Sequence, residues 1–350
     1  MCLGAGPPLL SGTAPGSLAL LPEEIAAHRA AQRPPALTAA SALLADSTTQ
    51  QPLLALAPQT PRPMASTTKI MTALLTLERA RLDDRVVVPA SALIGEASMG
   101  LQAGEVVTVE ELLWGLLLAS GNDAALALAQ HVAGSEAAFV DLMNRRAAEL
   151  GLTSTHFANP HGLDAAGHQS SAYDLWRLAE AAMAYPKFRE IVASPTALVA
   201  GRRLWNRNEL LTRYPGADGI KTGTTPLAGQ VLVASVNRQQ HRAIAVVMGS
   251  QDRYGDAEAL FDAYFERFQW APAPQPAGPT AWVRLPDGRV LRVVAEAPPD
   301  LFLPRWLWPR VRTQAVWQAV GSDPGRLAGQ VRWYLGNELL GQAPAYLSPY

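Results

Sequence analysis

The pattern of apolar and polar positions predicts a buried helix that begins close to Ser66. After Ser66, apolar residues repeat at helical spacing, at Ile70, Ala73, Leu74 and Leu77. Pro61 and Pro63 prevent a helix from starting earlier, because proline and the residue before it do not continue a helix. Ser66 is therefore expected at the N-terminus of a core helix.

The same pattern of apolar and polar positions predicts the other helices and strands. Helical periodicity indicates further helices at residues 22–32, 110–118, 123–132, 135–150, 170–184 and 257–268. Apolar runs bounded by turn residues predict two strand pairs, 39–46 with 53–57 and 229–236 with 242–249. Because strands occur at both ends with helices between them, we expect a mixed α/β domain whose sheet takes strands from both ends.

Composition divides the chain into four parts. Residues 1–35 are expected to form a flexible tail, and residues 36–270 the large domain. The segment 271–279 (APAPQPAGP) has the composition of a stiff linker. Residues 280–350 contain short apolar runs separated by Pro-Asp-Gly, Ser-Asp-Pro-Gly and Gly-Asn, which predicts a small β-rich domain.

Charge and cysteine content narrow the possible functions. The net charge is −1 and no basic block is present, so nucleic acid is not an expected partner. No apolar run reaches the roughly 18 residues needed to span a bilayer. The single cysteine, Cys2, excludes an internal disulfide and a cysteine-based zinc site. No histidine pair has the His-Glu-x-x-His spacing of a metal hydrolase.

The two termini give little indication of location. Residues 3–20 are apolar, but the first arginine or lysine is Arg29, so the basic start of a secretory signal is not visible. Cys2 would be a lipid-attachment site only if further sequence preceded it. The chain stops at Tyr350 directly after the β-rich part, so membrane association is possible but is not supported by the C-terminus.

The spacing of Ser66 and Lys69 would allow the lysine amine to activate the serine hydroxyl. Residues three apart on a helix share one face, so the hydroxyl and the amine can meet. A serine hydroxyl needs a base to become a nucleophile, and burial together with the helix dipole lowers the pKa of a lysine placed there. The alternative is a serine N-cap with a solvated lysine. Only three of the 29 basic residues are lysines, which makes Lys69 more notable.

Two further motifs can accompany this pair. Ser120-Gly121-Asn122 lies between two predicted helices, where the turn would expose a hydroxyl and an amide. Lys221-Thr222-Gly223 precedes the second strand pair, where an edge strand could offer an ammonium and a hydroxyl to a carboxylate. Each motif alone also suits ordinary structure, as a helix cap or as the end of a surface strand.

Taken together, the three motifs resemble a known signature. Ser-x-x-Lys, Ser-x-Asn and Lys-Thr-Gly in this order are typical of penicillin-binding proteins and class A β-lactamases. Longer stretches, such as SGNDAALALAQHVAGS, FANPHGLD, SSAYDL, NRNELL and DGIKTGTT, resemble the low-molecular-mass D-alanyl-D-alanine carboxypeptidases of serine peptidase family S11. The resemblance covers about residues 39–270 and implies a β-lactamase/transpeptidase-like catalytic domain followed by a small β domain.

The resemblance assigns catalytic roles to the first two motifs. Ser66 would be the nucleophile that forms an acyl-enzyme, and Lys69 its general base. Ser120 would relay a proton to the leaving D-alanine, and Asn122 would bind the substrate backbone.

The resemblance also implies how the substrate is held. Lys221, Thr222 and Arg207 would contact its terminal carboxylate, and Gly223 would allow close backbone approach. The oxyanion would be held by the backbone N–H groups of Ser66 and Thr224. Many relatives carry His, Phe or Tyr at position 224, so side-chain effects on deacylation are not transferred to this chain.

His161 and Asp174 also match positions of the family pattern, with less direct roles expected. His161 could help to organise the site from its loop, whereas Asp174 could equally cap a helix or pair with an arginine.

The expected function is removal of the terminal D-alanine from peptidoglycan stem peptides, with β-lactams as covalent inhibitors and no cofactor or metal. Such an enzyme would act outside the cytoplasmic membrane. D,D-endopeptidase action or a non-catalytic penicillin-binding sensor remain alternatives. A Ser-His-Asp hydrolase is disfavoured because no Gly-x-Ser-x-Gly motif is present, and a class A β-lactamase because no Glu-x-x-Leu-Asn loop is found.

Overall fold

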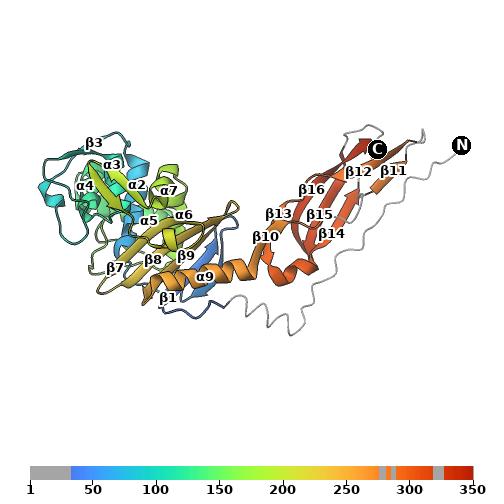
Figure 1. The fold of residues 1–350 in the computed structure, drawn as a ribbon, viewed down its shortest axis with the longest axis horizontal. Coiled ribbons are helices and arrows are strands. Elements are labelled where there is room, and N and C mark those ends of the chain that lie inside the picture. Colours follow the sequence, from blue (N-terminus) through green and yellow to red (C-terminus); the bar gives the residue numbers. More distant parts are fainter. Residues whose placement is uncertain (1–32, 276–280, 285–288, 318–326, 350) are drawn as a thin grey trace. The chain divides into compact units, whose positions relative to one another are not determined.

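A computed structural model describes residues 33–275, 281–284, 289–317 and 327–349 (Figure 1). The chain divides between Tyr264 and Phe265 into two compact units. The tail and helix predicted within residues 1–32, and residues 276–279 of the predicted linker, lie outside the described residues.

The N-terminal unit is built on a five-stranded antiparallel sheet. Its strands follow the order β2 (Gln51–Leu56), β1 (Ser41–Asp46), β9 (His241–Ser250), β8 (Gly229–Arg238) and β7 (Ala217–Thr225). The sheet therefore takes strands from both ends of the unit, as the sequence predicts. β7 is an edge strand and carries the Lys-Thr-Gly motif.

Helices cover the sheet and enclose the main core. They are α2 (Lys69–Arg79), α3 (Val109–Leu117), α4 (Asn122–Ala133), α5 (Glu136–Glu149), α6 (Ala172–Met183) and α7 (Pro186–Ala193). Their starts carry the expected signals, because Ser135 and Ser171 cap α5 and α6 with their hydroxyl groups and Pro186 occupies the first turn of α7.

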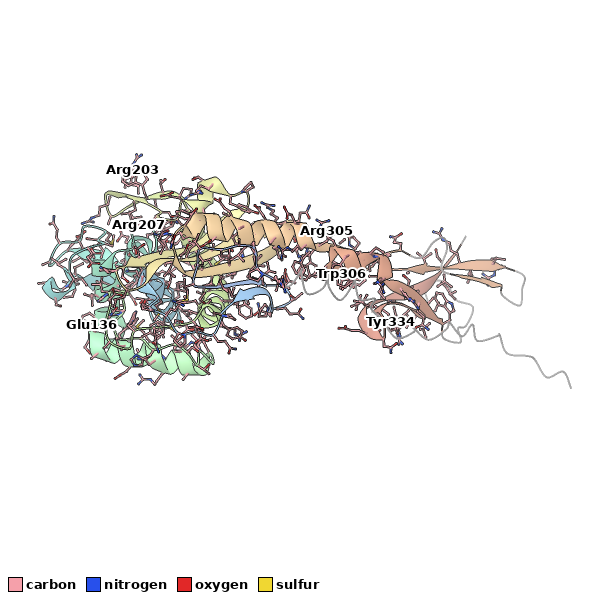
Figure 2. The ribbon with its side chains drawn as sticks, turned by 90° about the horizontal axis from the view of Figure 1, so that it is seen from below. Glu136, Arg203, Arg207, Arg305, Trp306 and Tyr334 are labelled. Atoms are coloured by element: carbon pink, nitrogen blue, oxygen red, sulfur yellow. The ribbon has the colours of Figure 1, made fainter. Side chains whose placement is uncertain are left out.

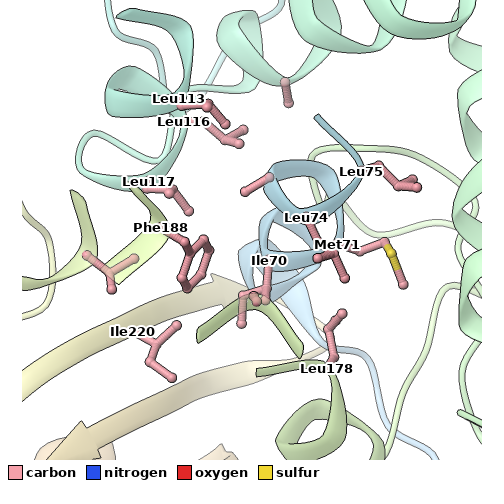
Figure 3. Packing of buried hydrophobic residues seen from close by; sticks show 14 of the residues in the cluster. Ile70, Met71, Leu74, Leu75, Leu113, Leu116, Leu117, Leu178, Phe188 and Ile220 are labelled. Carbon is pink, nitrogen blue, oxygen red and sulfur yellow. The ribbon is translucent and has the colours of Figure 1, made fainter. Parts of the chain in front are cut away.

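Helix α2 lies at the centre of this core. Figure 3 shows Ile70, Met71, Leu74 and Leu75 of α2 surrounded by apolar side chains of neighbouring elements, namely Leu113, Leu116, Leu117, Leu178, Phe188 and Ile220. All four α2 side chains are fully buried. This burial on every side fixes α2, and with it the turn that carries Ser66.

Helix α9 (Arg253–Arg267) crosses the sheet next to β8 and β9 (Figure 1). Polar contacts fasten it to the first residues of the unit. Tyr264 donates a hydrogen bond to Asp46 of β1 at 2.7 Å, and buried Asp256 accepts hydrogen bonds from Thr38 and Ser250. At its start, Arg253 donates to Gly223 O of β7 and to Gln230 Oε1 of β8, so this end of α9 has a defined place beside both strands.

Several short elements were not predicted. β3 (Arg85–Val87) pairs with β4 (Val106–Thr108), β5 (Thr196–Val199) pairs with β6 (Arg202–Trp205), and helix α8 (Leu210–Arg213) follows. In addition, a 3-10 helix η2 spans Ala90–Ala92. These segments are three or four residues long, which is too short for a periodic pattern to identify. Helix α7, with eight residues, was not predicted either.

The C-terminal unit consists mostly of β-strands. β10 (Phe268–Pro272) pairs with β13 (Asp300–Pro304), and a 3-10 helix η3 (Arg305–Arg310) follows β13. A five-stranded sheet has the order β11 (Ala281–Arg284), β12 (Val290–Ala295), β16 (Glu338–Pro349), β15 (Leu327–Leu335) and β14 (Arg312–Trp317). The predicted Gly-Asn turn joins β15 and β16, where Leu335 pairs with Glu338.

The boundary between the units differs from the one predicted at residues 270 and 271. Ala271 and Pro272 belong to β10 and pair with Leu301 and Asp300, so the start of the proline-rich segment is a strand of the C-terminal unit. The two-stranded pair β10–β13 leaves an edge where proline is tolerated, because proline lacks the N–H that an inner strand must donate.

Candidate active site

Ser66 lies in a tight turn immediately before α2. The 3-10 helix η1 (Ala65–Thr68) leads into α2, whose first residue is Lys69. Hydroxyl groups brace this turn, since Thr67 Oγ1 donates to Met64 O at 2.6 Å and Thr68 Oγ1 donates to Ala65 O at 2.8 Å. The predicted helix start is therefore correct, with Ser66 one turn ahead of the regular α-helix.

The Lys69 amine is fully buried next to the Ser66 hydroxyl. Its Nζ lies 3.0 Å from Ser66 Oγ, 2.8 Å from Asn122 Oδ1 and 2.5 Å from the backbone oxygen of His161. Burial, followed by the positive charges of Lys221 and Arg207, holds the pKa of Lys69 well below its ordinary value. A lysine in this state is available as a base.

The Ser120-Gly121-Asn122 turn connects α3 to α4 and presents both polar side chains to the same site. Ser120 has a φ of 61°. Asn122 is anchored by two contacts, because its N–H donates to Ala97 O at 2.7 Å and its Nδ2 donates to Gly95 O at 3.2 Å. The amide oxygen of Asn122 is thereby directed to Lys69.

Lys221, the first residue of the Lys-Thr-Gly motif on β7, is hydrogen-bonded to the Ser-Gly-Asn motif. Its Nζ donates to Ser120 Oγ at 3.0 Å and to Thr222 O at 2.9 Å. Burial, with the nearby charges of Arg207 and Arg253, lowers the pKa of Lys221 to about 7. This lysine therefore loses its proton more readily than a solvated lysine does.

Gly223 is required by the close approach of β7 to the Ser66 turn. A Cβ atom at Gly223 would lie 2.9 Å from Ala65 Cβ and 3.0 Å from Ser66 N. Any larger side chain would push the strand away from the nucleophile.

A cavity of about 790 Å³ opens over these groups. The predicted residues that line it are Ser66, Ser120, Asn122, Arg207 and the run 222–224. Lys69 and Lys221 lie behind this lining, almost completely buried. The three motifs thus meet at one cavity, as their combination predicts. Arg207 is exposed at this site, and Arg203 projects outward near it (Figure 2).

Arg253 is a site residue that the sequence reasoning missed. It is the first residue of α9, lines the cavity, and donates to Gly223 O at 2.9 Å and to Thr224 Oγ1 at 2.7 Å. Its guanidinium adds a second permanent cation near Arg207. No motif surrounds Arg253 in the sequence, and only the packing of α9 against the sheet brings it to the site.

Asp123, next to Asn122, was also missed. Its buried carboxylate accepts hydrogen bonds from Ser98 Oγ and from the backbone N–H groups of residues 99, 100 and 101. It therefore holds the loop that contacts Asn122. Its position directly after the Ser-Gly-Asn motif was the available signal.

His161 takes part in the site through its backbone. Its carbonyl oxygen accepts from Lys69, whereas its ring Nδ1 accepts from the N–H of Leu163. Burial, with the charge of Lys69 and with His168, lowers the pKa of His161 to about 4, so its ring is neutral at pH 7. Glu136 Oε1 lies 3.7 Å from His161 Nε2 and therefore faces a neutral imidazole. Figure 2 shows Glu136 on the opposite side of the unit from Arg203.

Asp174 is not brought to the cavity. It lies in the first turn of α6, where its carboxylate accepts from Ser154 N and Thr155 Oγ1, both at 2.8 Å. It does not line the cavity, and its contacts hold the chain segment before residue 157. The hydroxyl of Ser171, not the Asp174 carboxylate, caps α6, and Asp174 instead braces residues 154 and 155.

Within the described ranges, no group of three or more His, Cys, Asp or Glu side chains could hold a metal ion. Among the same residues, no helix has the length and apolar character needed to cross a membrane.

Comparison with known proteins places the chain in a family. Residues 28–252 match the family model of D-alanyl-D-alanine carboxypeptidase, Peptidase_S11. The chain is 37% identical over 239 residues to D-alanyl-D-alanine carboxypeptidase DacF of Bacillus subtilis, covering 64% of this chain and 61% of the relative. It is 40% identical over 240 residues to DacD of Escherichia coli, covering 65% and 62%. The alignments thus span about three fifths of these relatives.

Solved structures agree with this placement. Penicillin binding protein 6B of Escherichia coli superposes with a TM-score of 0.70 at 32% identity, over 89% of this chain and 96% of that one. Penicillin binding protein 5 of Haemophilus influenzae gives 0.69 at 27% identity, over 90% and 98%. The mixed α/β transpeptidase fold with a C-terminal β domain is therefore confirmed, and the chain belongs to the S11 family of D-alanyl-D-alanine carboxypeptidases.

Proposed function

We propose that this protein is a serine-type D-alanyl-D-alanine carboxypeptidase that trims peptidoglycan stem peptides through an acyl-enzyme on Ser66. The observation that carries the proposal is the buried Lys69 amine, 3.0 Å from Ser66 Oγ and with a lowered pKa. Lysine deprotonated by burial is the base that a serine nucleophile requires.

The contacts of Lys69 suit a neutral amine. A neutral amine has two hydrogens and one lone pair. The two oxygens of Asn122 and His161 accept the hydrogens, which leaves the lone pair for the Ser66 hydroxyl proton. Ser66 Oγ then attacks the carbonyl carbon of the penultimate D-alanine while its proton moves to Lys69 Nζ. The resulting oxyanion is held by the N–H groups of Ser66 and Thr224.

Collapse of this intermediate releases the terminal D-alanine. The carbon–nitrogen bond breaks and the leaving nitrogen takes a proton through Ser120, whose hydroxyl contacts Lys221. Lys69 supplies the proton it took from Ser66. Water then attacks the ester and gives a proton to Lys69. Lys69 passes this proton to the Ser66 oxygen as the ester bond breaks, which restores the serine hydroxyl and the neutral amine.

Positive charge at the cavity supports removal of a terminal residue. Arg207 and Arg253 line the cavity, and Lys221 lies directly behind it. A free carboxylate on the last D-alanine would pair with these groups and raise the pKa of Lys221, so that this lysine becomes fully charged when substrate binds. A peptide without that carboxylate would leave the cations unpaired.

The same arrangement would accept β-lactams, which combine a reactive carbonyl with a nearby carboxylate. Opening of the lactam ring would leave an ester on Ser66. Because peptidoglycan lies outside the cytoplasmic membrane, we propose that the protein acts there.

The test measures D-alanine release from a diacylated peptide ending in Lys-D-Ala-D-Ala. We expect release by the native protein and none by Ser66→Ala. The matched substrate carries a C-terminal amide and should be cleaved far more slowly, because it cannot pair with Arg207 and Arg253.

Two alternatives predict different results. A D,D-endopeptidase would cleave a cross-linked dimeric stem peptide faster than the terminal D-alanine. A sensor would form a stable penicillin adduct but release no D-alanine. Equal rates on the acid and amide peptides would contradict the carboxylate-binding role.

A further inference from the structure

A chain of hydrogen bonds connects buried His168 to the peptide group that precedes Ser66. His168 Nε2 lies 2.8 Å from Thr68 Oγ1, and Thr68 Oγ1 donates to Ala65 O at 2.8 Å. On its other side, His168 Nδ1 accepts from the N–H of Ala158 at 2.9 Å. His168 is 5% exposed, Thr68 is fully buried, and neither lines the cavity.

Which group donates in each of these hydrogen bonds follows from the Ala158 N–H, which can only be a donor. The Ala158 N–H can only donate, so Nδ1 must be unprotonated and the ring proton sits on Nε2. Nε2–H therefore donates to Thr68 Oγ1, which leaves the threonine hydrogen for Ala65 O. Burial, with the charge of His156, lowers the pKa of His168 to about 4, which keeps this neutral form at pH 7.

This chain sets the orientation of one peptide plane. The C=O of Ala65 and the N–H of Ser66 belong to the same planar trans peptide group and point in opposite directions. Holding Ala65 O toward Thr68 turns Ser66 N–H the other way. A Cβ atom at Gly223 would lie 3.0 Å from Ser66 N, so that nitrogen is beside β7, the strand that carries Thr224.

The backbone conformation of Ala65 makes this orientation costly. Ala65 has a φ of 49°, in the left-handed region, which costs a residue with a Cβ roughly 1–2 kcal/mol. The Thr68 hydroxyl offsets this cost, and by hydrogen bonding to the carbonyl it also makes the attached N–H a stronger donor.

We propose that His168 and Thr68 are positioning residues that aim the Ser66 N–H into the oxyanion hole. This inference rests on the proposed acyl-enzyme function and assigns a role to two buried residues outside the groups that line the cavity.

Paired variants separate the two bonds of His168. Glutamine reaches the position of Nε2, so His168→Gln keeps a donor for Thr68 and loses the Nδ1 acceptor. Asparagine reaches the position of Nδ1, so His168→Asn keeps the bond from Ala158 and loses the donor to Thr68. At the next step, Thr68→Val removes the hydroxyl with little change of volume, and Thr68→Ser restores it.

The experiment resolves acylation by benzylpenicillin into the dissociation constant of the first complex and the rate constant of ester formation. Thermal unfolding of each variant is measured in parallel. Loss of an oxyanion donor costs roughly 10²–10³-fold, so a misdirected donor should cost about 10-fold or more. We expect this loss of rate constant in Thr68→Val and His168→Asn, with the dissociation constant within about 2-fold of native. Thr68→Ser and His168→Gln should stay close to native.

Two results would overturn the inference while leaving the proposed function intact. One is acylation of Thr68→Val and His168→Asn at the native rate. The other is a loss in all four variants that follows their loss of thermal stability, which indicates a structural role only. If Thr68→Val does not fold, the two His168 variants decide the question. Absence of any adduct in the native protein would instead contradict the proposed function itself, and the inference with it.

Discussion

Replacing Gly162 by alanine should move the catalytic turn by a predictable amount. Gly162 has a φ of 94°, and a Cβ atom there would lie 2.1 Å from Ala65 O and 2.8 Å from Ser66 N. Ordinary contacts of a Cβ atom begin near 3.4 Å, so the two segments must separate by more than 1 Å. One of these segments carries Ser66, and the other carries the His161 oxygen that binds Lys69.

A displacement of this size affects both catalysis and stability. Misplacement of a reacting group by 1 Å can cost about 100-fold in rate. We therefore expect Gly162→Ala to lower the rate constant of acylation by benzylpenicillin about 100-fold. The backbone strain of alanine in the left-handed region should also cost roughly 1–2 kcal/mol of unfolding free energy.

Gly134→Ala is the matched control. Gly134 ends α4 with a φ of 78°, and a Cβ atom there would meet nothing within 4 Å. This variant should show the cost of backbone strain alone, without the added cost of overpacking, and native acylation. The assay combines the rate of penicillin adduct formation with denaturant unfolding. If Gly162→Ala acylates at the rate of Gly134→Ala, the close packing of Gly162 on the Ser66 turn does not position the nucleophile.

Four further substitutions test individual roles. Lys69→Arg should lower the rate constant of acylation by roughly 10²–10⁴-fold, the usual contribution of a general base, because arginine keeps the charge but cannot accept the proton. Substantial D-alanine release by this variant would contradict Lys69 as the general base. Glu96→Gln should move the acid limb of the acylation–pH profile to lower pH. The Glu96 carboxylate lines the cavity and raises the pKa of Lys69, so its removal increases the fraction of neutral Lys69 at a given pH. An unchanged acid limb would be inconsistent with Lys69 as the titrating base. Arg253→Gln should reduce kcat/KM roughly 10- to 100-fold for the acid peptide, as a hydrogen bond to a charged group contributes about 1.5–3 kcal/mol. The amide peptide should lose less, because only the bonds of Arg253 to Gly223 and Thr224 are removed there; equal losses on both peptides would contradict a carboxylate-binding role. Asp174→Asn should lower the unfolding free energy by about 1–3 kcal/mol through unpaired partners at residues 154 and 155, with acylation retained in the folded protein.

The sequence predicted the parts of the site that depend on local spacing. Helical periodicity placed Ser66 one turn before Lys69, where their side chains meet, and the strands at both ends of the unit formed a single sheet. Three short motifs were predicted to converge because the family pattern unites them. Ser120 and Lys221, which are 101 residues apart, are indeed in contact.

Contacts that depend on packing or on the backbone were not predictable in this way. Arg253 reaches Thr224 only because α9 begins beside the sheet. His161 contributes a carbonyl oxygen, and a carbonyl has no sequence signature. The bonds of His168 to Thr68 and Ala158 likewise cross between segments far apart in the chain. Composition was misleading at Pro272, because a proline-rich run can also form an edge strand.

The most direct test of the account is the mass of the intact protein after incubation with benzylpenicillin, followed by peptide mapping of the adduct. The account predicts one penicilloyl group per chain, attached to the peptide that contains Ser66 and absent from Ser66→Ala. An adduct on another residue, or no adduct on the folded native protein, would contradict Ser66 as the nucleophile and Lys69 as its base.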